Sequence, residues 1–179
     1  MSSSTVAAAG QRLGRRASVT GYLDAMSALA SGVVVVTCRI DGRPWGTTVT
    51  AFSSVSADPP TVLVSLGSGT AAARAIDHSG SFGVSILAEE QAQVARHCSR
   101  PGADKYLERF AAVGASAASP AVAGALAHLD CDVIDRIPVA DHLLFVGEVR
   151  TARPLAGERA PLVYQGRTYR RLAGTRLSS

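Results

Sequence analysis

An acidic side chain and a histidine stand side by side at Asp141-His142, within the stretch IPVADHLLFVGEVR (residues 137–150). Such a pair can act as an acid/base couple, ligate a metal, contact a bound ligand, or form a polar turn before a strand. A catalytic dyad also needs a nucleophile, and no G-x-S-x-G motif accompanies this pair. A metal site needs further ligands at fixed spacing, which the other three histidines of the sequence do not supply. A ligand contact and a polar turn are therefore the favoured interpretations, and no metal is expected.

A second chemical feature is the stretch SLGSGTAAARAI (residues 65–76), in which Gly67 and Gly69 bracket Ser68 and Thr70 opens a helix. Backbone N–H groups at a helix start, together with small hydroxyl side chains, can bind a phosphate. The same residues also make an ordinary helix N-cap. The stretch is neither a Walker loop nor a Rossmann fingerprint, because it lacks the Gly-Lys-Ser/Thr ending and the required glycine spacing.

A third feature is WGTTVTAFSSVSADPP (residues 45–60), a predicted strand that carries small hydroxyl side chains instead of bulky apolar ones. Such a strand can lie against a flat polar ligand while its backbone supplies hydrogen bonds. An edge strand with a solvated face would show the same pattern. Both interpretations stay open at the level of this stretch.

Composition limits the classes of partner. The 179 residues carry a formal charge of +4, and this charge comes from scattered arginines and a single lysine, Lys105. Diffuse basic charge suits an anionic small molecule such as a nucleotide at least as well as nucleic acid, and no basic stripe with interleaved aromatic residues indicates nucleic acid. No apolar run approaches the length of a membrane span, so we expect a soluble protein without a membrane or nucleic-acid partner. Three distant cysteines, without metal or disulfide spacing, favour a reducing cytoplasm.

The elements expected to position these residues are mostly strands. Residues 20–32 predict a short amphipathic helix with Thr20 as its cap, and Asp41-Gly42 predicts a hairpin turn. A second hairpin is expected to turn at Gln165-Gly166, and residues 99–124 are expected to form a long surface connection. We predict a disordered lead-in over residues 1–19 and one domain over 20–179. Its fold class is mainly β, an antiparallel barrel with a few short flanking α-helices.

Six segments in this order resemble the flavin reductase-like, FMN-binding split-barrel family, whose short members serve two-component flavin-dependent monooxygenases. The resemblance spans about residues 20–172 and implies that the barrel is a split β-barrel. The segments are AMSALASGVVVVTC, GTTVTAFSSVSADPPTVLVSL, SGSFGVSILAEEQAQVA, DKYLERF, ADHLLFVGEV and PLVYQGRTYRRL.

The resemblance implies a flavin site built from three segments and one cation. Its residues are Thr48, Val49, Thr50, Ala51, Ser65, Leu66, Ser68, Thr70, Phe82, Gly83, Val84 and Lys105. The first four would wrap the isoalloxazine ring, and the next four would help to hold the ring edge and the phosphate. The following three would border the flavin, and Lys105 would meet a phosphate.

The resemblance also gives the opening pair a role. The family usually shows Gly-Asp-His here, with the histidine near the nicotinamide, whereas this chain has Ala140-Asp141-His142. His142 and Asp141 are thus the catalytic candidates, with Asp141 fixing the histidine tautomer or the turn. Alanine at 140 would cost about 1 kcal/mol or more if the position needs a positive φ. Thr50 stands where asparagine is common, so one flavin contact would be weaker or made by a hydroxyl.

The implied activity is hydride transfer from C4 of NADH, or less favourably NADPH, to N5 of FMN or FAD. The reduced flavin would then diffuse to a partner monooxygenase, and the protein would be a homodimer. Two alternatives stay open. One is a split-barrel protein that binds flavin without turnover, and the other is a reductase of ferric iron or another acceptor that uses the same site.

Overall fold

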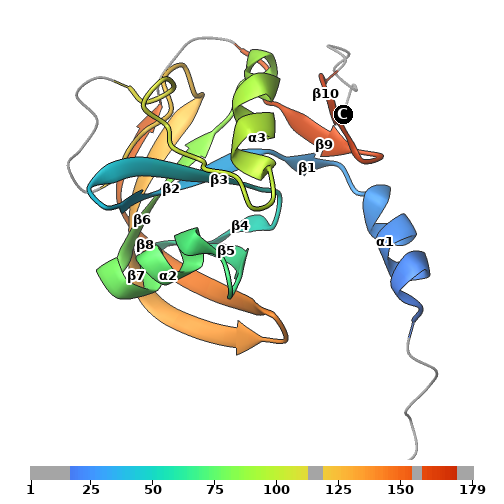
Figure 1. Cartoon of the computed structure of the whole chain (residues 1–179), viewed down its shortest axis with the longest axis horizontal. Helices are drawn as coiled ribbons and strands as arrows, with labels where there is room; N and C mark the ends of the chain where they lie inside the picture. Colours follow the sequence, from blue (N-terminus) through green and yellow to red (C-terminus); the bar gives the residue numbers. More distant parts are fainter. Residues whose placement is uncertain (1–16, 113–118, 155–158, 173–179) are drawn as a thin grey trace, which may run out of the picture.

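The computed structural model of the chain describes residues 17–112, 119–154 and 159–172 (Figure 1). The expected lead-in therefore lies outside the described residues up to residue 16. The helices are α1 (Val19–Ser27), α2 (Ala71–Ser79) and α3 (Ala92–Ser99), with the 3₁₀ turn η1 (Glu89–Gln91) before α3. The strands are β1 (Ser31–Gly32), β2 (Val34–Ile40), β3 (Arg43–Val49), β4 (Phe52–Ala57), β5 (Pro60–Gly67), β6 (Ser81–Ile86), β7 (Ala127–Val139), β8 (His142–Pro154), β9 (Val163–Gln165) and β10 (Thr168–Arg170).

The large sheet is antiparallel and follows the strand order β3-β2-β6-β7-β8-β5-β4. Its two edge strands, β3 and β4, are neighbours in the chain and are separated only by Thr50 and Ala51. Two residues cannot cross a flat sheet of this width, so the sheet must curl until its edges meet. The predicted mainly β barrel with a few short helices is confirmed, and a small sheet β1-β9-β10 flanks it.

Two hairpin turns show how local chemistry directs this topology. Asp41 and Gly42 link β2 to β3 with φ of 52° and 74°, as a two-residue hairpin loop requires, and that prediction is confirmed. The turn between β9 and β10 is displaced by one residue from the prediction. Gln165 pairs with Thr168, so the loop residues are Gly166 and Arg167, with φ of 58° and 60°.

The apolar side chains form two clusters on opposite faces of the curled sheet. The cluster inside the barrel centres on large buried side chains, namely Val36, Val64, Phe82, Val84 and Phe145. The second cluster packs β2 and β9 against α3, and its buried members include Val35, Leu87, Cys98, Leu107 and Leu162. Alternate residues of β2 serve different clusters because successive side chains of a strand point to opposite faces.

The segment between α3 and β7 corrects one expectation. It was predicted to run over the surface, but Leu107 and Val122 are fully buried, and Ser119 is almost so. The stretch around Val122 contains only small residues, so no helical or alternating pattern marks it as buried. Its burial depends on the barrel face that it covers. Residues 113–118 of this segment lie outside the described part of the chain.

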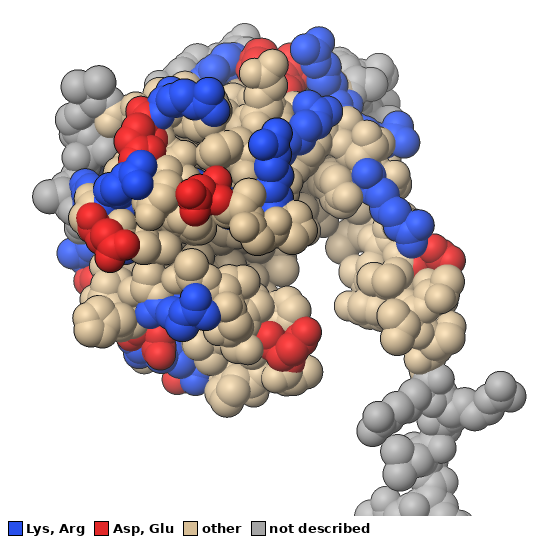
Figure 2. All heavy atoms as spheres, viewed as in Figure 1, with Lys and Arg blue, Asp and Glu red and all other residues tan. Residues whose placement is uncertain are grey.

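Helix α1 stands away from the barrel (Figure 1). Its N-cap is Ser18, whose hydroxyl accepts a hydrogen bond from the amide of Gly21, so Thr20 is not the cap as predicted. An ion pair of 2.7 Å joins Asp24 to Arg167. The side chains of Leu23 and Met26 are 50% and 44% exposed, so the expected apolar face is left uncovered. A hollow separates α1 from the rest of this face, and Lys and Arg side chains gather at its upper end (Figure 2). None of the helices in the described ranges is long and apolar enough to cross a membrane.

Candidate functional site

The seam where the two sheet edges meet positions the hydroxyl-rich stretch. Thr50 and Ala51 bridge β3 and β4, and both residues are exposed. The carbonyl oxygen of Ala51 accepts a hydrogen bond from the amide of Ser65 at 3.0 Å, which ties the seam to the end of β5. Two segments that the resemblance assigned to one ligand are thus adjacent at one rim of the barrel.

The turn between β7 and β8 meets the same rim. Gly67 at the end of β5 pairs with His142 at the start of β8. Beyond it, the amide and the hydroxyl of Ser68 both donate to the carbonyl oxygen of Asp141, at 2.9 and 3.0 Å. The turn itself needs a left-handed residue, because Ala140 has a φ of 51°. The missing glycine therefore matters in this chain, since an L-residue resists that conformation.

Asp141 and His142 contact each other directly. The imidazole Nδ1 lies 2.8 Å from Oδ1 of Asp141, and the side chains are 50% and 89% exposed for His142 and Asp141. The hydrogen bond from His142 lowers the pKa of Asp141. An ionised carboxylate only accepts hydrogen bonds, so Nδ1 must carry the proton. In neutral His142 this arrangement leaves Nε2 as an acceptor that faces solvent.

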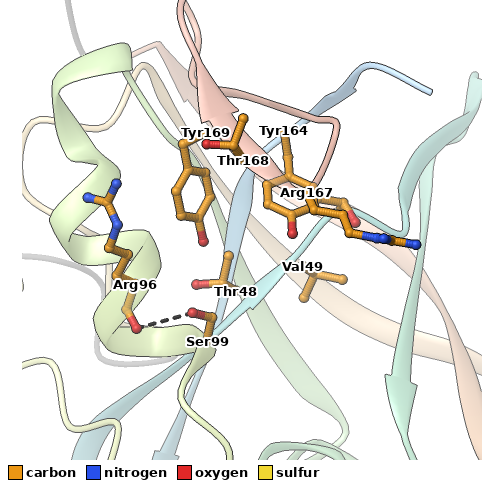
Figure 3. A pocket seen from close by; sticks show the side chains of 9 residues that line it. Thr48, Val49, Arg96, Ser99, Tyr164, Arg167, Thr168 and Tyr169 are labelled. Atoms are coloured by element: carbon orange, nitrogen blue, oxygen red, sulfur yellow. Dashed lines mark hydrogen bonds between the residues drawn. The ribbon is translucent and has the colours of Figure 1, made fainter. Parts of the chain in front are cut away.

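A cavity of about 390 Å³ opens beside the seam (Figure 3). The end of β3, the last turns of α3 and the β9–β10 hairpin each form one side of it. Its lining residues are Thr48, Val49, Thr50, Arg96, Ser99, Tyr164, Arg167, Thr168 and Tyr169. The hydroxyl of Thr48 donates to the carbonyl oxygen of Ala95 at 2.7 Å and so holds α3 against β3. A second cavity, of about 530 Å³, lies between this hairpin and α1 and shares Thr50, Tyr164 and Arg167 with the first.

Aromatic rings and one arginine give the first cavity its chemistry. The rings of Tyr164 and Tyr169 meet edge to face, with their centroids 5.3 Å apart. The guanidinium of Arg96 lies 5.4 Å from the centroid of Tyr169. Aromatic walls with a few polar groups and a cation suit a flat, anionic ligand such as a nucleotide.

Other residues of the implied flavin site lie elsewhere. Phe82 and Val84 are buried in the barrel core. Gly83 faces the buried polar groups of Thr37 and His128, which its missing side chain admits. None of the three lines the cavity beside the seam. Lys105 is partly buried behind α3, where burial lowers the pKa of its ammonium group, and it lies outside this cavity too.

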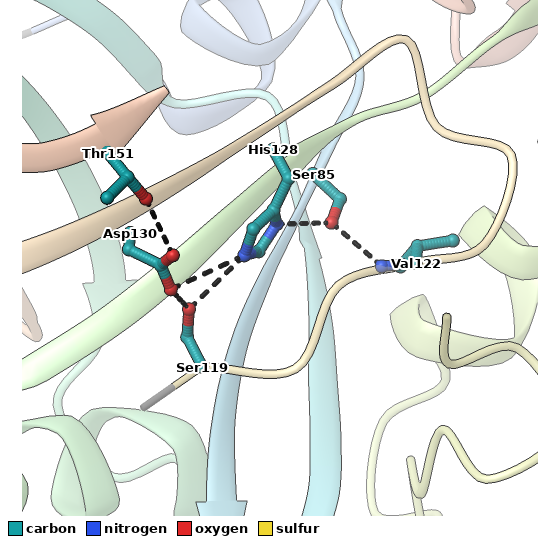
Figure 4. A network of polar contacts seen from close by, with 6 residues as sticks. All are labelled: Ser85, Ser119, Val122, His128, Asp130 and Thr151. Carbon is teal, nitrogen blue, oxygen red and sulfur yellow. Dashed lines mark hydrogen bonds and ion pairs between the residues drawn. The ribbon is translucent and has the colours of Figure 1, made fainter. Parts of the chain in front are cut away.

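A buried polar network lies where the segment from Ser119 to Val122 covers strands β6 and β7 (Figure 4). His128 is 3% exposed, with Nδ1 at 3.0 Å from the Ser85 hydroxyl and Nε2 at 3.2 Å from the Ser119 hydroxyl. Ser119 also donates to Asp130, which accepts a second hydrogen bond from Thr151 at 2.8 Å. The network resembles a catalytic triad in composition only, because Ser119, His128 and Asp130 are buried. It joins the segment at Ser119 to strands β6, β7 and β8.

The described residues contain neither a reactive thiol nor a metal site. All three cysteines are free and buried, and burial raises the pKa of each thiol to about 12. Such thiols are not nucleophiles at neutral pH. Among the described residues, no group of three or more His, Cys, Asp or Glu side chains is placed to hold a metal ion.

Comparison with known protein families identifies the family to which this chain belongs. Residues 26–173 match the family model described as a flavin reductase like domain. This chain belongs to the flavin reductase-like family.

Individual relatives agree with the family assignment. The chain is 41% identical over 135 residues to the reductase component of a 4-nitrophenol 4-monooxygenase/4-nitrocatechol 2-monooxygenase from Rhodococcus opacus, covering 75% of this chain and 71% of that protein. It is 38% identical to an NADH-dependent flavin reductase from a Rhodococcus species, over 83% of each chain. Its fold is similar to the solved structure of an NADH:FAD oxidoreductase from Streptomyces globisporus in complex with NAD and FAD fragments. The TM-score is 0.79 at 31% identity, over 87% of this chain and 93% of that one.

The flavin reductase-like chain contains site residues that sequence reasoning did not single out. Five residues of the cavity beside the seam were missed, namely Ser99, Tyr164, Arg167, Thr168 and Tyr169, and Arg96 was considered only as one scattered arginine. The motif YQGRTY at residues 164–169 carries two tyrosines at the ends of one hairpin and was the available signal. The position of α3 opposite that hairpin has no signal in the sequence.

Proposed function

We propose that this flavin reductase-like protein is an NADH-dependent flavin reductase that supplies reduced FMN or FAD to a partner monooxygenase. The observation that supports the proposal most strongly is the shared rim of the barrel. There the seam at Thr50-Ala51, the end of β5 at Ser65 and the turn with His142 are tied together by backbone hydrogen bonds and pairing. The names of the relatives, NADH-dependent flavin reductase and monooxygenase reductase component, agree with it.

The reaction moves a hydride from C4 of NADH to N5 of the flavin, leaving NAD⁺, and a proton from solvent completes the reduced flavin. The two nucleotides supply this chemistry, so the protein has to place them in contact. Holding donor and acceptor about 3–3.5 Å apart removes much of the entropy cost of their encounter. In our proposal the rim at Thr50 and Ala51 holds the flavin ring with backbone groups and a hydroxyl.

His142 is the proposed nicotinamide contact. Its Nδ1–H is held by Asp141, and this leaves Nε2 as an acceptor for a donor such as the carboxamide of the nicotinamide. Ser68 fixes the turn by its two hydrogen bonds to Asp141, so the histidine does not have to be ordered when the ligand binds. Asp141 is thus a positioning residue, and neither group transfers a proton in this scheme.

The proposal also includes assembly and location. We propose a homodimer, because apolar side chains are uncovered on α1 at Leu23 and Met26 and on the β7–β8 hairpin at Ile134 and Ile137. Sedimentation at equilibrium tests this, and a monomer at micromolar concentration would contradict it.

We propose the cytoplasm as the location, because all three cysteines are unpaired thiols.

Anaerobic mixing of the purified protein with NADH and FMN or FAD tests the activity. Absorbance of the reduced nicotinamide at 340 nm should fall only when a flavin is present, and flavin absorbance should fall in step. Binding of flavin without NADH oxidation would favour the binding-protein alternative. NADH oxidation that requires a ferric complex in addition to the flavin would favour the acceptor-reductase alternative.

A further inference from the structure

We propose that Arg96 holds the phosphate of the bound flavin, in the cavity between α3 and the β9–β10 hairpin. This inference rests on the proposed function for the identity of the ligand. It assigns the phosphate to a side of the rim away from the glycine-rich turn at Ser68 and Thr70. The cation that would bind it is carried by α3, which the resemblance did not assign to the ligand.

Arg96 is the cation of this cavity that is free to bind an anion. It makes no ion pair with a carboxylate among the residues that the structure describes, and its one aromatic neighbour is Tyr169. Arg167, the other arginine of the cavity, is neutralised by Asp24 at 2.7 Å. A phosphate is best met by a guanidinium that is not already paired, since a paired one must first break its bond.

The position of Arg96 relative to the seam is fixed by the fold. The hydrogen bond from Thr48 to the carbonyl oxygen of Ala95 places the next residue, Arg96, beside the end of β3. Thr50 lies two residues after Thr48 and lines the same cavity as Arg96. A ring held at Thr50 would therefore have Arg96 within reach of the chain that carries its phosphate.

Side-chain hydroxyls in the same cavity add hydrogen-bond donors to the guanidinium of Arg96. The side chains of Thr50 and Thr168 make no hydrogen bond to another described residue, so both are available to a ligand. The hydroxyls of Thr48 and Ser99 already donate to backbone carbonyl oxygens. The Arg96 guanidinium and the Thr168 hydroxyl match the oxygens of a phosphate, which accept hydrogen bonds only, and the Thr50 hydroxyl remains for the flavin ring.

The glycine-rich turn is a weaker phosphate site because the donors of Ser68 and the guanidinium of Arg74 are already engaged. The amide and the hydroxyl of Ser68 both donate to Asp141. The hydroxyl of Thr70 accepts from the amide of Ala73 as the N-cap of α2. Arg74, the nearest cation on that helix, donates to the carbonyl oxygen of Gly69 at 2.6 Å. A phosphate bound by Ser68 or Arg74 would have to displace these bonds.

Riboflavin provides the decisive comparison, since it carries the same ring as FMN without the phosphate. We expect Arg96→Gln to weaken FMN binding by about ten- to hundredfold, as loss of a charge-assisted hydrogen bond does, and to leave riboflavin binding unchanged. FAD, whose phosphates occupy the same place, should weaken similarly. Arg96→Lys should recover part of the loss, because it restores the charge without the planar fork.

Equilibrium titration followed by flavin fluorescence measures these constants without turnover. The matched control is Arg150→Gln, since Arg150 pairs with Asp132 at 3.1 Å away from the cavity. The melting temperature of each variant checks folding. The inference is overturned if Arg96→Gln leaves FMN binding unchanged or weakens FMN and riboflavin equally, and also if Ser68→Ala produces the selective loss instead. A wild-type protein that binds flavin but does not oxidise NADH would contradict the proposed reductase activity and leave this assignment of the phosphate standing.

Discussion

The carbonyl oxygen of Asp141 accepts two hydrogen bonds from Ser68, one from the amide at 2.9 Å and one from the hydroxyl at 3.0 Å. These residues are far apart in sequence, and their contact joins the β7–β8 turn to the loop that follows β5. The side chain of Asp141 then holds Nδ1 of His142 at 2.8 Å. The histidine is thereby fixed at the rim by its own turn and by a second loop.

Ala140→Gly should stabilise the protein. Alanine with a φ of 51° carries a strain of roughly 1–2 kcal/mol, and glycine relieves it at a smaller entropic cost in the unfolded chain. We expect a gain of about 0.5–1 kcal/mol in the free energy of unfolding, measured by urea denaturation. Ala152→Gly, on an exposed position of β8, is the control and should lose about as much. An equal change in the free energy of unfolding for both substitutions would show that Ala140 is not strained.

His142→Ala should raise the KM for NADH by about fivefold, the loss of one hydrogen bond of about 1 kcal/mol, with little change in the KM for flavin. Steady-state rates at varied NADH and saturating flavin measure this. Asp141→Asn should give a smaller increase, since it removes the charge and keeps an acceptor oxygen for Nδ1. An unchanged KM for NADH in His142→Ala would remove the nicotinamide assignment.

Gly83→Ala should destabilise the barrel by about 2–3 kcal/mol. A Cβ at this position would overlap the hydroxyl of Thr37 and lie 2.7 Å from both Ser119 Oγ and a ring carbon of His128. The buried network cannot move aside without breaking its hydrogen bonds. Gly32→Ala is the control, because a Cβ there meets no atom within 4 Å. Thermal unfolding of the two variants should separate them clearly, and similar melting temperatures would disprove the crowding.

The buried network should make stability depend on pH. Burial lowers the pKa of His128, and the nearby Asp130 offsets this only in part. The unfolded histidine titrates near pH 6.5, so below that pH the unfolded state binds more protons than the folded state. Burial raises the pKa of Asp130, but hydrogen bonds from Ser119 and Thr151 outweigh it and the net pKa is lowered. Both groups therefore stabilise the fold at neutral pH and lose this contribution as the pH falls, His128 first.

Melting temperatures between pH 8 and pH 4.5 test this dependence. The wild type should be constant down to about pH 6.5 and then decline. His128→Gln should be less stable at pH 8 by about 1–3 kcal/mol, because its partners lose a hydrogen bond, and its decline between pH 6.5 and 5 should be shallower. A decline of equal slope in both proteins would show that other groups cause it.

Local signals in the sequence were sufficient for most elements of secondary structure. The Asp41-Gly42 turn and the Thr70 cap lie where they were predicted, because each depends on the φ or the hydrogen bonds of a few adjacent residues. Local signals predicted the wrong position where two nearby residues could fill the same role in a cap or a turn. Ser18 caps α1 in place of Thr20, and the last hairpin turns one residue late at Gly166 and Arg167.

What the sequence determined by itself was the predominance of strands, the barrel class and the family resemblance, since these follow from periodicity and from motifs read in register. The tertiary structure decided which residues share a surface. It buried Phe82 and Val84 in the core, and it brought Arg96 to Tyr169 beside the end of β3. Periodicity shows that a strand has two faces, but only the contacts between distant segments settle which face is covered and which one meets a ligand.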